Sequence, residues 1–69
     1  METKNREFDP GKMKAARAKA KMSQLDLCYA SGIPVTMIRE YEQGKSGPSV
    51  ARLFIIADTL GCSADELAS

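Results

Sequence analysis

The chain has 69 residues and a net charge of only +1, with 43% hydrophobic and 28% charged residues, a composition typical of one small globular domain. No apolar run approaches the roughly 20 residues that span a bilayer, and the polar start lacks the apolar segment of a secretion signal, so we expect a cytoplasmic protein without membrane contact. There is no histidine, the commonest general base, and Cys28 and Cys62 lie too far apart for a zinc site. We therefore do not expect an enzyme or a small-molecule substrate. A metal site and a cofactor are not expected either.

The charges are unevenly distributed along the chain. Residues 1–22 carry seven cationic and three acidic side chains, whereas residues 48–69 carry one cation and three acids. A basic edge can attract phosphate in spite of the small total charge, because the Debye length at physiological salt is only about 8 Å. The alternative is a solvated helix surface, and both interpretations are open for the lysines of the first helix, which are Lys12, Lys14, Lys19 and Lys21.

The first predicted helix follows a short polar segment. Residues 1–8 show no periodicity and are expected to form a mobile arm. Asp9 and Pro10 are typical of an N-cap and a first helical residue, and the helix is expected to run to about Lys21. Its inward stripe is rich in alanine and methionine but also includes Arg17, so we expect this arginine to have an acidic partner.

Two short helices are predicted next. Ser23 is a suitable N-cap for a helix that ends near Ser31, and Gly32 can supply the positive φ of a helix C-terminus. Pro34 suits the first turn of a second helix, which is expected to end near Glu42. If the two helices cross steeply and bury their apolar sides, the side chains left outside are Val35, Thr36, Arg39, Glu40 and Gln43.

The last third of the chain predicts two more helices. A loop rich in glycine and serine separates the previous helix from one that ends near Leu60 and has the apolar period of about 3.6 residues typical of a core helix. Ser63 and Glu66 then form a predicted capping box for a final short helix. The elements together predict a single all-α domain of five helices over residues 9–69.

Residues 23–45, SQLDLCYASGIPVTMIREYEQGK, resemble the helix-turn-helix of the lambda-repressor and Cro-like DNA-binding domains. The shared features are Ser-Gln at the start of one helix, a Leu-small pair inside it, Gly in the turn and Glu-x-Gly-Lys after the next helix. The resemblance covers about residues 12–68. It implies a compact lambda-repressor-like domain with the helix-turn-helix at helices 2 and 3, and an ion pair of Arg17 with Glu42 that holds helix 1 on helix 3.

The same resemblance implies a sequence-specific transcriptional regulator that binds a pseudopalindromic operator in double-stranded DNA as a homodimer, with helix 3 in the major groove. Gln24 and Lys45 match positions that hold phosphate from opposite sides. The residues of helix 3 that match the family's DNA contacts are Val35, Thr36, Arg39 and Glu40.

Helix 3 departs from the family pattern, because Pro34 and Val35 replace the polar residues that are common at its start. Val35 can offer only apolar contact, for instance to a thymine methyl group, whereas Thr36 can add a hydroxyl bond. Glu40 can only accept, which suits a cytosine amine, and Arg39 could reach a phosphate or a guanine. With so few base readers a monomer is expected to discriminate poorly, which makes a homodimer the expected binding form.

Exposed apolar residues leave a second function open. Phe54 and Ile55 resemble the family's two-fold contact, although Ile55 could equally be an isolated surface residue. Leu25 and Tyr29 form an apolar pair where relatives carry charged residues, and this pair either meets a partner or only packs locally on the helix. Together with the acidic Glu40 and the low net charge, these residues would permit a protein-interaction module on the same fold that does not read DNA.

Overall fold

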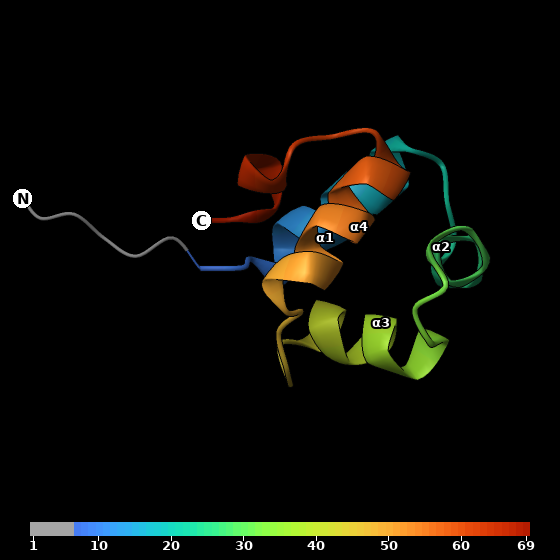
Figure 1. Cartoon of the computed structure of the whole chain (residues 1–69), viewed down its shortest axis with the longest axis horizontal. Helices are drawn as coiled ribbons and strands as arrows, with labels where there is room; N and C mark the ends of the chain where they lie inside the picture. Colours follow the sequence, from blue (N-terminus) through green and yellow to red (C-terminus); the bar gives the residue numbers. More distant parts are fainter. Residues whose placement is uncertain (1–6) are drawn as a thin grey trace, which may run out of the picture.

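The computed structural model describes residues 7–69, which form four α-helices and one closing turn (Figure 1). The elements are α1 (Pro10–Lys19), α2 (Gln24–Ser31), α3 (Val35–Gln43), α4 (Val50–Leu60) and the 3-10 turn η1 (Ala64–Leu67). The all-helical prediction is confirmed, but the expected fifth α-helix is wrong. Ala68 is already extended (φ −120°, ψ 151°), so the segment after Ser63 has room for only one tight turn.

The starts of the helices follow the predicted capping chemistry. Asp9 accepts hydrogen bonds from the amides of Gly11 and Lys12 at the start of α1. Ser23 and Asp26 form a capping box at the start of α2, and the bonds from Ser23 hold the pKa of the Asp26 carboxyl below its ordinary value. Helix α3 begins one residue later than predicted, because Pro34 has a ψ of 139°, outside the helical range, and is its N-cap.

Helix α1 ends earlier than predicted, at Lys19 rather than near Lys21. Lys21 has a φ of 60°, the left-handed region that glycine adopts readily and other residues rarely adopt. This left-handed residue turns the chain away from α1, and Arg17 fixes the turn by donating from Nη1 to the carbonyl oxygen of Met22 at 2.8 Å. No local pattern predicts this end, since lysine is a good helix former.

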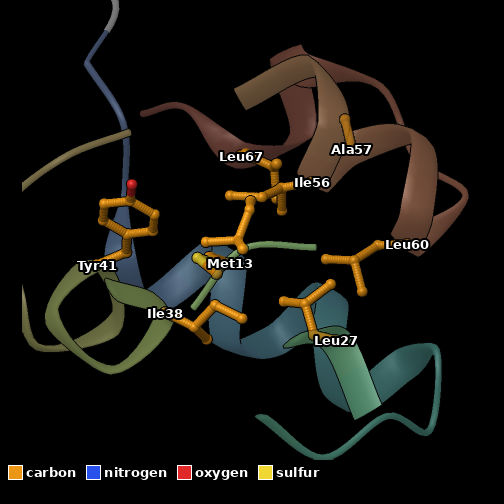
Figure 2. Packing of buried hydrophobic residues seen from close by; sticks show 9 residues of the cluster. Met13, Leu27, Ile38, Tyr41, Ile56, Ala57, Leu60 and Leu67 are labelled. Atoms are coloured by element: carbon orange, nitrogen blue, oxygen red, sulfur yellow. The ribbon is translucent and has the colours of Figure 1, made fainter. Parts of the chain in front are cut away.

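Every element contributes a buried side chain to one core (Figure 2). Tyr41 is the largest of them, and its hydroxyl group accepts a hydrogen bond from Nη1 of Arg52 at 3.0 Å. Leu67 of η1 is fully buried, so the closing turn is part of the core rather than a loose end. The other fully buried large side chains are Met13, Leu27, Ile38 and Ile56.

The two ends of the described chain pair with each other. Phe8 and Ala68 form an antiparallel bridge, flanked by a bond from the amide of Asp9 to the carbonyl oxygen of Leu67 at 2.8 Å. The ring of Phe8 also meets Tyr41 edge to face, with 6.3 Å between the ring centres. Of the arm predicted over residues 1–8, residues 1–6 lie outside the described part, while Phe8 belongs to the packed domain.

Candidate nucleic-acid interface

Helix α3 divides its side chains between the core and an outer face. Ile38, Tyr41 and Glu42 are buried, while Thr36 and Arg39 are exposed. Figure 1 shows α3 along the lower edge of the molecule, with no other described element beyond it. The structure therefore brings all four predicted helix 3 contacts to the outer side of one helix, where Thr36 and Arg39 are exposed and Val35 and Glu40 half-buried.

A buried ion pair joins α1 to the end of α3, as the resemblance implied. Arg17 donates to Glu42 through Nε at 2.7 Å and through Nη2 at 3.0 Å, in the paired geometry that suits a guanidinium and a carboxylate. The side chain of Glu42 is only 2% exposed and that of Arg17 17%. The hydrogen bonds to Glu42 raise the pKa of the Arg17 guanidinium, against the lowering effect of burial.

Gln24, a predicted phosphate contact, belongs to the same network. Its Nε2 donates to Oε1 of Glu42 at 3.2 Å, so the side-chain amide nitrogen is engaged inside the protein. No residue spacing predicts this bond, because it forms only when α2 and α3 pack against each other. The second N–H of this amide and the first backbone amides of α2, at Gln24 and Leu25, can still donate to an anion.

The loop that follows α3 is bonded to this helix on the side away from Gln24. Gly44 ends the helix with a φ of 76°, and the amide of Lys45 donates to the carbonyl oxygen of Glu40 at 2.9 Å. Ser46 adds a long bond from its hydroxyl to Oε1 of Glu40 at 3.4 Å, which restrains a carboxylate predicted to read bases. The side chain of Lys45 is exposed.

Two contacts fix α3 from opposite sides: Gln24 of α2, and the loop of Lys45 that follows α3. We call them the two fixed points. Residues 40 and 42 are about 200° apart around the helix axis, because each residue turns an α-helix by about 100°. The side chain of Gln24 is bonded to the side chain of Glu42, and Ser46, in the loop that follows α3, is bonded to the side chain of Glu40. The exposed residues Thr36 and Arg39 lie on the outer arc between them. This arrangement can hold two strands of a polyanion on either side of a helix that faces outward.

Helices α2 and α3 are joined by a short turn at Gly32 and α3 lies on the outside of a small helical bundle, which is the arrangement of a helix-turn-helix domain. The profile of the helix-turn-helix family HTH_3 matches residues 13–67, and the chain belongs to that family. No protein of curated function matches the chain in a sequence comparison.

Two solved structures are similar to the whole domain. The solution structure of the DNA-binding domain of the P22 c2 repressor is 26% identical, with a TM-score of 0.81 over 93% of this chain and 84% of that one. The crystal structure of the P22 c2 repressor with the synthetic operator 9T is also 26% identical, with a TM-score of 0.79 over 88% of this chain and 92% of that one. The lambda-repressor-like fold and the family predicted from the residues are thereby confirmed. Within residues 7–69 no helix is both long and apolar enough to span a membrane.

Proposed function

We propose that this protein is a sequence-specific transcriptional repressor that binds operator DNA with α3 in the major groove. The observation that carries the proposal is the outer face of α3, which offers exposed Thr36 and Arg39 between Gln24, bonded to Glu42, and the loop of Lys45, where Ser46 is bonded to Glu40. Membership of the helix-turn-helix family and similarity to a repressor solved with its operator support it.

The side chains divide into phosphate contacts and base contacts. Lys45 binds phosphate on one side of α3, and the first backbone amides of α2, beside Gln24, bind it on the other. Val35 and Thr36 meet base edges at the start of α3, where a thymine methyl group suits both. The remaining proposed contacts are Arg39, to a phosphate or a guanine, and Glu40, to a cytosine amine.

The proposed binding form is a homodimer on two half-sites about one helical turn apart. Phe54 is 55% exposed and Ile55 41% exposed, so α4 offers apolar surface for a second copy. A helix with at most one or two bidentate base contacts, each worth about 1 to 3 kcal/mol, gains most of its discrimination by using two copies.

The direct test is to select bound duplexes from a random pool and to titrate the complex with salt. A repressor should enrich a pseudopalindromic sequence, and the logarithm of its affinity should fall with log salt at a slope of about −0.9 per phosphate contacted.

One observation favours a second function, a protein-interaction module, because Tyr29 is 78% exposed and Leu25 48% exposed on α2. No salt-sensitive binding at about 50 mM salt would favour that module.

Two substitutions separate the proposed roles. Lys45→Ala is expected to weaken binding to all sequences alike and to reduce the salt slope by about 1, because it removes a phosphate contact. Thr36→Ala is expected to change the preference among selected sites and to leave the slope unchanged. Both positions are exposed, so thermal unfolding should match the wild type. Equal losses on every duplex for both variants would contradict the assignment of Thr36 as a base reader.

A further inference from the structure

A hollow of about 490 Å³ lies between α1, the end of α4 and the closing turn η1. Pockets that hold small molecules commonly measure about 300 to 1,000 Å³, so the hollow has the size of a ligand site. Its lining residues come from α1, the end of α4 and residues 61–66, whereas α3 lies along the lower edge of the molecule in Figure 1. The hollow, which we call the α1 hollow, is therefore separate from the outer face of α3.

One side of α1 forms the floor of the α1 hollow. The residues that α1 and its C-cap contribute follow the spacing of three and four positions that places side chains on one side of a helix: Lys12, Ala15, Ala16, Lys19 and Ala20. Leu60, at the end of α4, and Cys62 also line the hollow. Burial raises the pKa of the Cys62 thiol, so this side chain stays neutral. Between the two lysines the floor is therefore apolar.

The two lysines border this floor at its ends. Lys12 and Lys19 are seven residues apart, which is about two helical turns, or about 10 Å along the axis. Lys12 donates from Nζ to the carbonyl oxygen of Ala68 at 2.9 Å, and this neutral partner uses one of its three N–H groups. No carboxylate within residues 7–69 forms an ion pair with Lys12. Its charge and two of its donors are thus available at one end of the hollow.

The charges at the other end partly cancel, because Glu66 also lines the hollow. The pKa of the Glu66 carboxyl is lowered chiefly by its bond from the backbone of Ser63, and the charge of Lys19 adds to this effect. Oε2 of Glu66 accepts from the amide of Ser63 at 3.0 Å, so the carboxylate is held in the capping box of η1. The uncompensated positive charge of the α1 hollow therefore lies at Lys12.

We propose that the α1 hollow binds a small amphipathic anion, with its charged group at Lys12 and its aliphatic chain on the alanine floor toward Leu60. Charge complementarity selects the anion, because an uncharged chain would leave the donors of Lys12 unused and a cation would be repelled by it. Such a ligand would join α1 to the end of α4 and to η1, so it should stabilise the folded domain. The inference does not depend on DNA binding, since it concerns a separate surface.

The test uses the wild-type domain, labelled for nuclear magnetic resonance, with octanoate as the probe. Octanoate should shift the amide resonances of Ala16, Gly61 and Cys62 and raise the midpoint of thermal unfolding. Along the series butanoate, hexanoate and octanoate, each added CH₂ group should tighten binding by up to about fourfold, because it buries apolar surface. Octanol, which has the same chain without the charge, should bind up to about fivefold more weakly than octanoate, the worth of an exposed ion pair.

Two variants with matched controls locate the site. Lys12→Gln should weaken octanoate binding by up to about fivefold, whereas Lys14→Gln removes the same charge from an exposed position outside the hollow and should leave it unchanged. Ala15→Phe should fill the hollow and abolish the amide shifts. Ala18→Phe adds the same ring to an exposed position of α1 outside the hollow, so the shifts should remain.

Three results would overturn the proposal. They are an absence of amide shifts with octanoate, shifts confined to the exposed apolar side chains around Phe54 on α4, and equal affinities for octanoate and octanol. Lys12 is exposed, so Lys12→Gln should fold like the wild type, and an unchanged octanoate affinity in that variant would overturn the placement of the charged group whether or not Ala15→Phe folds.

Discussion

Glu42→Ala is expected to lower the free energy of unfolding by about 3 to 5 kcal/mol, the cost of breaking a buried ion pair by removing one partner. The substitution would leave the guanidinium of Arg17, whose side chain is only 17% exposed, without its two bonds to the carboxylate. It would also remove the acceptor of the Gln24 side chain. Native stabilities are about 5 to 15 kcal/mol, so a 69-residue domain could be largely unfolded by this single change. Urea unfolding followed by circular dichroism measures the loss.

The matched control replaces both charges, as in the double variant Arg17→Met with Glu42→Leu. Apolar pairs that replace a buried ion pair are often neutral or stabilising by about 1 to 4 kcal/mol, so the double variant should be more stable than Glu42→Ala. It also frees Nε2 of Gln24 within a folded domain. A loss below about 1 kcal/mol for Glu42→Ala would show that the pair behaves like an exposed surface salt bridge.

Local chemistry explains the parts of the fold that the sequence predicted well. Asp9, Ser23 and Ser49 each accept from backbone amides at the first turn of the helix that follows, and this preference depends only on nearby residues. Gly32 and Gly44 end their helices in the left-handed conformation for an equally local reason. The ion pair of α1 with α3 spans 25 residues of sequence, and only the family resemblance implied it.

Contacts between distant segments account for what the sequence did not predict. The bridge from Phe8 to Ala68 joins the two ends of the described chain, and no local pattern signals such a pairing. The bond from Gln24 to Glu42 likewise depends on how α2 meets α3, so Gln24 was predicted only as a phosphate contact. The left-handed conformation of Lys21, which ends α1, was not predicted for another reason: lysine has a high helix propensity, which favours continuing the helix.

Phe54→Glu is expected to abolish the proposed homodimer and to weaken binding to a two-half-site operator by about 100-fold or more. Linked binding events commonly gain about 10² to 10⁴ in apparent affinity over a single contact, and that gain disappears when the second copy is lost. Phe54 lies one helical turn after Val50, which is 70% exposed, so the two form one apolar strip on α4. A carboxylate in that strip would have to be buried between two copies without a partner.

The matched control is Tyr29→Glu, which places the same charge at an exposed aromatic residue on α2. If α4 carries the homodimer, Tyr29→Glu should keep wild-type affinity for the two-half-site duplex, whereas Phe54→Glu should bind it no better than a duplex with one half-site. Sedimentation of the protein on each duplex gives the number of copies bound. Because Phe54 is more than half exposed, thermal unfolding of the variant should stay close to the wild type, so lost affinity would reflect lost pairing. Equal affinities of Phe54→Glu and the wild type would place the contact between copies elsewhere, and a loss confined to Tyr29→Glu would place it on α2.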